Sequence, residues 1–356
     1  MSNSKDYPRR KNYVRILSLL IICLSVVSVY LSYPAVSSAI GPNFDYYSKL
    51  KLEYQYTDYF EYKWPQYVEY IFGESEFSQP SPFLSQFPEH RFLTKITQAF
   101  GPNTELQVKY QYGHLDKTYE YDTNGDLLKS NNLEEIYNAR LERKINDSFT
   151  INGSGQYTSA SGDFTGWMGD FGFKYDFGGF FMVEPGVSLF WNDAAGSKQN
   201  AQAYNLKLRQ ALTNSTALQV KYSYFNATGE SGFNYNTVTT WLSQWLPTQT
   251  ALHLSLRYHW DSIENKSLSP GFEAIQYLDW ATTLSLSYRF LTLENDDPSS
   301  DFYDQINGDS FDSNSFAILL KRNMWNDTDF LIKYRYYTSN QDVRMSTYLF
   351  GIEQVF

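Results

Sequence analysis

The sequence predicts an exported, all-β protein that folds as a closed, antiparallel, membrane-spanning β-barrel of about 16 strands. Three observations lead to this fold class. The N-terminal segment has the parts of a cleavable secretion signal, and a short alternation of apolar and polar residues recurs along the rest of the chain. Short turns precede most copies of this alternation and long polar segments follow them, as expected for a chain that crosses a membrane with strands.

The first 39 residues differ from the remainder. Basic residues from Lys5 to Arg15 come first, an uncharged apolar run covers residues 16–31, and Ser37, Ser38 and Ala39 end the segment. This order is typical of a secretory signal peptide. We therefore expect residues 1–39 to be cleaved and residues 40–356 to form the barrel. The alternative, an uncleaved anchor helix, is disfavoured because the run is shorter than the roughly 20 residues that a span needs.

Cysteine content and charge exclude several function classes. Cys23, the one cysteine of the chain, lies in the signal segment, so the mature chain has no thiol for a disulfide, a nucleophile or a metal site. The whole chain carries a net charge of −10, and loss of the basic signal makes the remainder more acidic. We therefore expect no nucleic-acid partner, and we expect no cofactor.

One short pattern recurs along the mature chain. In its first copy, Leu50, Leu52, Tyr54 and Tyr56 alternate with charged or amide residues. A period of two places the two sets on opposite faces of a strand. The apolar face, aliphatic first and aromatic last, suits a wall that meets hydrocarbon and then lipid headgroups. Further copies begin near residues 106, 218, 252, 284 and 330, and looser copies near 149 and 181.

The turns and loops are unequal at the two ends of these predicted strands. Turn-forming residues precede the copies at 101–104, 146–148, 213–216, 247–250 and 326–328, and 279–282 has a weaker turn signal. Longer polar segments such as 123–132 and 192–200 follow the copies. Outer-membrane-type barrels have short periplasmic turns and longer extracellular loops, and this sequence shows the same asymmetry.

Eight outward strands need eight return strands to bring both chain ends to the same side. We expect them near residues 91–100, 133–145, 164–177, 201–211, 236–246, 272–278, 315–323 and 344–356. The segment 272–278 has the weakest pattern, and without it the count would fall to about 14, still an even number.

The last predicted strand carries a further signal. Phe356 is the final residue, and Tyr348, Phe350 and Ile352 alternate before it. This ending resembles the C-terminal recognition signal of Gram-negative outer-membrane β-barrel proteins, porins among them, and departs from it at Gln354. The resemblance implies insertion by the barrel-assembly machinery, location in the bacterial outer membrane, and contact with its lipids and lipopolysaccharide. No motif points to one family within this class.

The polar face of the repeat predicts a basic lumen. Fewer acidic residues than basic ones share this face, and many acids gather in segment 294–312 instead. Rings of Lys and Arg select anions, so we expect a pore for passive passage of small hydrophilic solutes that prefers anions. Alternatively, the charges pair across strands and only keep the wall solvated. The predicted lumen residues are Lys49, Lys51, Lys109, Arg140, Lys207, Arg209, Lys221, Arg257, Arg289, Lys333 and Arg335.

Other functions stay open. The aromatic-rich segment 59–89 is long enough to narrow or cover a pore. The barrel could instead be a sleeve around a partner such as a multihaem cytochrome, or a structural or adhesin-like barrel. A homotrimer and a periplasmic partner protein also remain open. Catalysis is disfavoured because the chain has neither a Gly-x-Ser-x-Gly motif nor a His-x-x-x-His pair that would supply a nucleophile or a metal site.

Overall fold

The computed structural model describes residues 48–60, 89–121, 127–160, 164–194, 197–228, 234–262, 264–295, 311–325, 328–340 and 344–356. Contacts divide the chain into residues 1–46 and residues 47–356, and every described residue belongs to the second unit. The predicted signal peptide and most of segments 59–89 and 294–312 lie outside the described residues.

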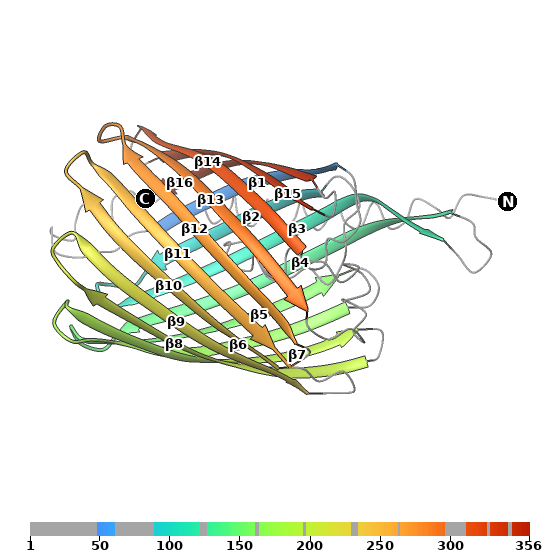
Figure 1. Cartoon of the computed structure of the whole chain (residues 1–356), viewed down its shortest axis with the longest axis horizontal. Helices are drawn as coiled ribbons and strands as arrows, with labels where there is room; N and C mark the ends of the chain where they lie inside the picture. The colour runs from blue at the N-terminus through green and yellow to red at the C-terminus, as the bar shows by residue number, and fades with distance from the viewer. Residues whose placement is uncertain are drawn as a thin grey trace. The chain divides into compact units, whose positions relative to one another are not determined.

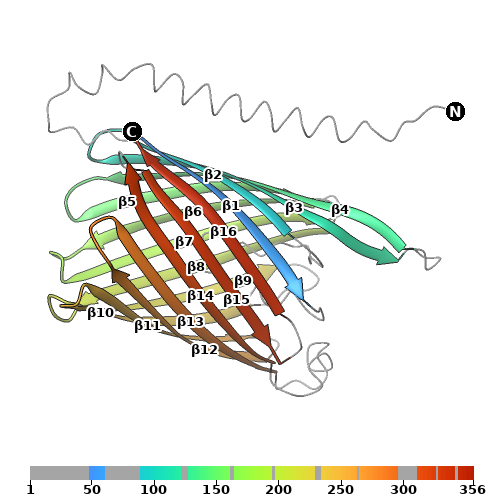
Figure 2. The ribbon, with the colours of Figure 1, turned by 90° about the horizontal axis from the view of Figure 1, so that it is seen from above.

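The described residues of this unit form sixteen antiparallel strands that close into one barrel (Figures 1 and 2). Each strand pairs with its neighbours in sequence, and the first pairs with the last. No helix in these ranges is long and apolar enough to cross a membrane. The strands are β1 (Ser48–Phe60), β2 (Glu89–Ala99), β3 (Thr104–Tyr121), β4 (Leu127–Lys144), β5 (Phe149–Ala160), β6 (Phe164–Asp176), β7 (Phe181–Ala194), β8 (Ser197–Ala211), β9 (Thr216–Thr228), β10 (Asn234–Leu246), β11 (Thr250–Asp261), β12 (Asn265–Tyr277), β13 (Thr282–Asn295), β14 (Phe311–Trp325), β15 (Thr328–Ser339) and β16 (Arg344–Val355).

The predicted fold class and the count of sixteen are confirmed, and the doubtful return strand near 272–278 is the second half of β12. Its first half gives a weak strand signal because it contains Pro270, which has no N–H to donate. The ladder between β12 and β13 is interrupted at this point, between the Leu268–Thr292 and Gly271–Arg289 pairs. The hydroxyl of Ser269 donates to the carbonyl of Phe290 at 2.9 Å, so a side chain supplies a donor where the backbone cannot.

Short turns join the strands at one end of the barrel, and we call this end periplasmic because outer-membrane barrels have their short turns there. The N–H of Phe100 donates to the carbonyl of Thr104 at 2.7 Å, and equivalent bonds close the turns after β4 and β8. The turn after β6, which the sequence signals did not include, contains Gly178 and Gly179 at φ of 78° and 84°. This left-handed region favours glycine.

The weaker turn signal at 279–282 also corresponds to a turn. The N–H of Leu278 donates to the carbonyl of Thr282 at 3.0 Å. The Asp279 carboxylate accepts the N–H of Ala281 at 2.7 Å, and this bond holds the pKa of Asp279 below its usual range.

At the other end, several connections are shorter than predicted. The sequence placed loops at 123–132 and 192–200, but β4 begins at Leu127, β7 runs to Ala194 and β8 begins at Ser197. Beyond the membrane both faces of a hairpin meet water, so polar residues continue the ladder without an apolar alternation. The β3–β4 hairpin consequently extends past its neighbours (Figure 2).

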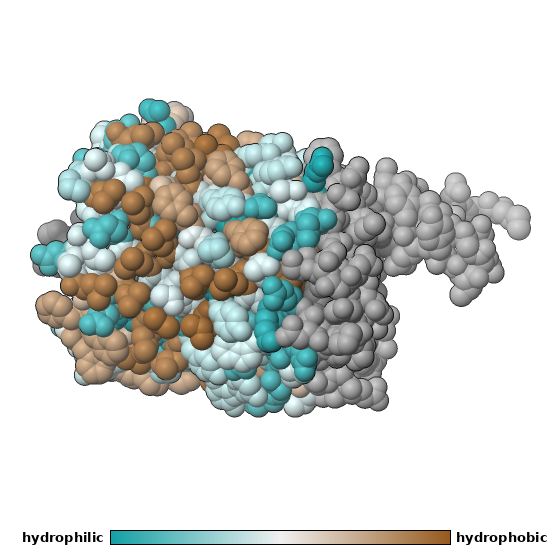
Figure 3. Space-filling view, viewed as in Figure 1, coloured by the Kyte–Doolittle hydropathy of each residue, from teal (hydrophilic) through white to brown (hydrophobic). Residues whose placement is uncertain are grey.

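The outer face of the barrel is apolar. Leu52, Val108, Leu254 and Ile332 are 45%, 46%, 52% and 51% exposed, whereas Lys51, beside Leu52, is only 9% exposed. Figure 3 shows hydrophobic residues spread over the strands nearest the viewer. A belt of exposed aliphatic side chains this extensive is unfavourable in water and is what a bilayer requires.

Aromatic residues on adjacent strands contact one another on this outer face, where the sequence repeat ends in tyrosine. Ring centroids lie 5.0 Å apart for Tyr110 and Tyr137 and 5.1 Å apart for Tyr334 and Tyr348. At the periplasmic end, Phe180 and Trp280 project from turns and are 73% and 92% exposed. Aromatic rings at both ends of the apolar belt are typical of membrane interfaces.

Candidate functional site: the inner wall

The residues that alternate with the exposed apolar belt share the inner face of the barrel. Lys221 precedes Tyr222, which is 40% exposed, and Arg257 lies between Leu256 and Tyr258, which are 48% and 42% exposed. The same alternation gives inner positions to the other basic residues of the prediction, namely Lys49, Lys51, Lys109, Arg140, Lys207, Arg209, Arg289, Lys333 and Arg335. Arg91 and Lys95 of β2 also have inner positions, because Phe92 between them is half exposed.

The register brings like charges directly opposite one another. Lys51 on β1 pairs with Lys95 on β2, and Lys95 pairs in turn with Lys109 on β3. On the other side of the barrel, Lys207 on β8 pairs with Lys221 on β9. Such rows depend on the register of several strands, so the spacing along the sequence alone does not reveal them.

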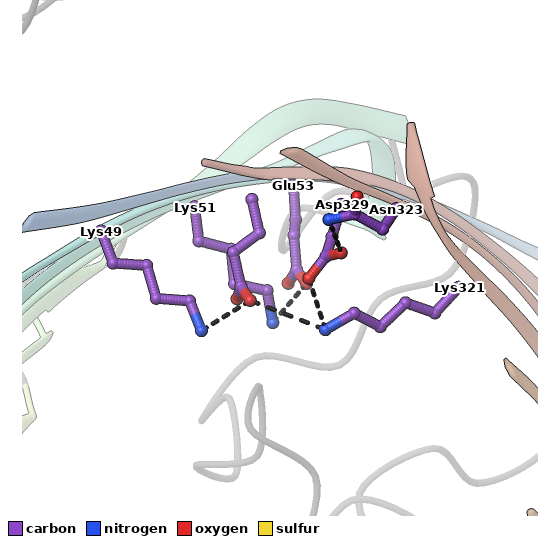
Figure 4. Close-up of polar contacts among 7 residues, drawn as sticks. Lys49, Lys51, Glu53, Lys321, Asn323 and Asp329 are labelled. Atoms are coloured by element: carbon purple, nitrogen blue, oxygen red, sulfur yellow. Dashed lines mark hydrogen bonds and ion pairs between the residues drawn. The ribbon is translucent and has the colours of Figure 1, made fainter. Parts of the chain in front are cut away.

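Acidic residues neutralise part of this wall where the first and last strands meet. Lys49 Nζ lies 2.6 Å from a Glu353 carboxylate oxygen, and Lys321 lies 2.7 Å from Asp329 and 3.7 Å from Glu353. Lys51 pairs with Glu53 at 2.6 Å. Figure 4 shows the lysine and acidic side chains that it labels pointing to one side of the sheet. We call this group, which joins β1, β14, β15 and β16, the seam cluster.

Two further basic residues of the prediction also have acidic partners. Lys207 Nζ lies 2.6 Å from Glu184, and Arg140 lies 3.1 Å from Glu142. The alternative interpretation of the sequence, charge pairing within the wall, therefore applies to these residues and to the seam cluster. The inner acids Asp329 and Glu353 were not predicted from the sequence, although the alternation around Ile352 assigns Glu353 to the inner face.

Other cations of the inner face form no ion pair with the residues that the structure describes. Among the described residues, no ion pair is formed by Lys95, Arg209, Lys221, Arg289 or Arg335. Gly271 leaves room beside Arg289, because a Cβ there would lie 3.6 Å from its Nε and 2.5 Å from the Ser255 hydroxyl. The cations that form no ion pair with described residues thus lie on β2, β8, β9, β13 and β15.

The inner face is not uniformly polar, contrary to the expectation from the repeat. Leu93, Ile136, Leu291 and Leu293 occupy inner positions and are at most 4% exposed. The parity of a strand fixes which way a side chain points, but it does not determine which inner positions meet water.

The histidines take part in polar contacts within the wall. A ring nitrogen of His253 lies 2.8 Å from the Ser243 hydroxyl, and one of His259 lies 3.1 Å from the Thr237 hydroxyl. Within the part of the chain that the structure describes, no group of His, Cys, Asp and Glu could hold a metal ion.

The sequence matches no protein-family model and no curated protein. Solved structures match in fold. A bacterial polysaccharide outer membrane secretin is 9% identical with a TM-score of 0.56, covering 87% of this chain and 98% of that chain. OprD of Pseudomonas aeruginosa and OccAB4 of Acinetobacter baumannii are each 9% identical with TM-scores of 0.47, covering 88% and 89% of this chain and 95% and 100% of theirs. The chain has the fold of an outer-membrane β-barrel. At these identities the similarity concerns the fold alone.

Proposed function

We propose that the barrel is a channel for passive diffusion of small hydrophilic solutes and that its lumen prefers anions. The observation that carries this proposal is the row of Lys51, Lys95 and Lys109 in direct register on three adjacent strands, in which Lys51 pairs with Glu53 and Lys95 forms no ion pair with described residues. Like charges directly opposite one another destabilise a sheet. A wall that only needed to be solvated would avoid this cost by alternating the signs of its charges.

The distribution of ion pairs also supports an anion preference. Acids neutralise the seam cluster, whereas Lys95, Lys221, Arg289 and Arg335 form no ion pair with described residues. Because the strands and the surrounding lipid have a low dielectric constant, unpaired cations on the inner face create a positive potential in the lumen. Anions then enter at lower energy than cations. A barrel of this strand number encloses enough space for water and small solutes.

Electrophysiology on the full chain tests this function. The protein is refolded in detergent, inserted in a planar bilayer, and held across a tenfold gradient of potassium chloride. We expect discrete channels whose reversal potential shows chloride preference. Lys95→Gln and Lys221→Gln should each lower this preference. Arg322 is exposed and has an outward-facing position on β14, so Arg322→Gln should leave the preference unchanged.

Cation preference in the unaltered protein would contradict the proposal. A correctly folded barrel that never conducts would also contradict it, and would favour a sleeve that functions only around a partner.

A further inference from the structure

Aromatic side chains form a second feature of the inner wall, near the extracellular ends of four strands. Each has an inner position by the alternation of its strand, as Phe190 lies between Leu189 and Trp191, which are 40% and 48% exposed. We call these inner residues the ring row, and they are Phe190 on β7, Phe225 on β9, Tyr235 on β10 and His259 on β11.

The rings contact one another continuously. Phe190 and Phe225 have centroids 5.7 Å apart, and Phe225 and Tyr235 are stacked at 4.7 Å with an angle of 14° between their planes. Tyr235 and His259 are 5.0 Å apart. At about 4.8 Å between strands, a row from β7 to β11 extends roughly 19 Å around the wall.

Small residues on the intervening strand make this row possible. Phe190 and Phe225 come from strands separated by β8, on which Ala201 pairs with Phe190 and Ala203 pairs with Phe225. Because an alanine side chain is a single methyl group, the two rings meet above it. A larger side chain at Ala203 would separate them, so the row depends on residues from all of these strands.

The ring row offers surface to the lumen. Phe190, Phe225 and Tyr235 are partly exposed, whereas the aliphatic inner residues Leu291 and Leu293 are at most 1% exposed. His259 is 5% exposed and lies within 3.1 Å of the Thr237 hydroxyl, so it supports the end of the row rather than facing the lumen.

Cations lie on the same face, one layer deeper. Lys221 precedes Phe225 by four residues on β9, and Arg257 precedes His259 by two residues on β11. At about 3.3 Å per residue these steps correspond to roughly 7–13 Å along the strands. A small ring that lies against the row therefore has its substituents within reach of a cation.

We propose that the ring row and these cations bind solutes that combine a six-membered ring with one acidic group. Because the faces of Phe225 and Tyr235 are stacked on one another, the solute ring packs against their exposed edges, and the acidic group is directed to Lys221 or Arg257. Packing of the ring selects against acyclic acids, and the cations select against neutral rings. Acidic sugars and aromatic carboxylates share this chemistry. The inference rests on the proposed function, because the solute must enter the lumen.

Block of the chloride current through the reconstituted full chain tests the site. The probes are glucuronate and benzoate as ring acids, gluconate as an acyclic acid and glucose as a neutral ring. We expect at least one ring acid to reduce the current saturably, at a concentration about 5-fold or more below that of gluconate or glucose. Block by glucuronate alone identifies an acidic-sugar site, and block by benzoate alone identifies a site for aromatic carboxylates.

Substitutions test whether block of the current depends on the ring row. Phe225→Leu with Tyr235→Leu keeps apolar volume but removes both aromatic rings, and should raise the half-blocking concentration of the ring acid about 5-fold or more. Ala203→Leu, which fills the space where Phe190 and Phe225 meet, should act in the same direction. Tyr224→Ala is the matched control. Tyr224 directly precedes Phe225 on β9, but it has an outward-facing position and packs on Tyr204.

Equal block by ring and acyclic acids, or unchanged block in the Phe225 and Tyr235 variant, would overturn the inference. Both results leave the anion preference of the channel intact, so they are distinguishable from a failure of the proposed function, in which chloride preference itself is missing.

Discussion

Lys49 and Glu353, on the first and last strands of the barrel, form an ion pair of 2.6 Å across the junction of β1 and β16. Backbone bonds reinforce this junction, since Ser48 and Phe356 exchange N–H and carbonyl groups at 3.3 Å and 2.7 Å. Lys321, on β14, lies 3.7 Å from the same Glu353 carboxylate. The last strand is therefore fixed on the inner face by charges from both sides, at the step that closes the barrel.

Glu353→Gln should weaken this closure. The change leaves Lys49 without its carboxylate and Lys321 with only Asp329. Because Lys49 is about one third exposed, solvent screens the pair, and we expect a loss of about 1 kcal/mol. The midpoint temperature of the band shift of unboiled protein on a detergent gel measures it. Glu142→Gln, which removes the exposed pair with Arg140, should have a smaller effect, and equal shifts would argue against a special role of the seam.

The Ser269 hydroxyl should stabilise β12 because Pro270 lacks a backbone N–H that could donate to β13. Ser269→Ala removes the donor to the Phe290 carbonyl and should cost about 1 kcal/mol. If Pro270 is also replaced by Ala, a backbone N–H becomes available, and the Ser269→Ala change should cost less in that background. A double-mutant cycle in urea gives both values. Equal costs in the two backgrounds would show that the hydroxyl does not compensate for the proline.

The faces of the barrel could be predicted from the sequence, because the alternation of Leu50, Leu52, Tyr54 and Tyr56 with polar residues indicates which side chains face lipid. The turns could be predicted where Gly, Pro, Asn or Thr cluster. The Gly178–Gly179 turn has the same chemistry and was identifiable.

The charge pattern of the lumen could be predicted only in part. Parity assigns Lys51, Lys95 and Lys109 to one face, but the stagger between strands decides whether they stand opposite one another or opposite acids. The pairing of Lys321 with Glu353 depends on this stagger across three strands. The ring row depends on it as well, and also on Ala201 and Ala203, which carry no signal of their own.

Gly178→Ala should destabilise the turn between β6 and β7. At φ of 78° an L side chain is strained, and we expect a cost of about 1 kcal/mol. Gly155→Ala on β5 is the control, because its added Cβ meets nothing within 4 Å and its φ lies outside the strained range. Unfolding midpoints in urea compare the two variants, and a larger loss for Gly155→Ala would contradict the assignment of strain to the turn.

The Asp279 turn should lose stability in acid. The Ala281 N–H lowers the pKa of this carboxyl from 3.8, so the ionised form stabilises the fold above about pH 3.8 and this contribution disappears as the pH falls through the lowered value. Asp279→Ala should therefore unfold at lower urea than the unaltered protein at neutral pH, with a small difference because the side chain is fully exposed. A difference that persists unchanged at the lowest pH would show that charge is not its cause.

A charged substitution on the outer face of β10 and β11 should impair folding into bilayers more than one on the inner face. Leu254, which is 52% exposed on the outer face, would carry an ammonium group into hydrocarbon as Leu254→Lys, at a cost of about 2–4 kcal/mol near the midplane. Leu254 pairs with Leu242 on β10, and one position further along the ladder Ser243 pairs with His253 on the inner face. Ser243→Lys adds the same charge toward the lumen, where water solvates it, and should cost less than about 1 kcal/mol. The folded fraction in vesicles across a urea series measures both variants. If Ser243→Lys proved the more damaging, the assignment of lipid and lumen faces from the alternating pattern would be reversed.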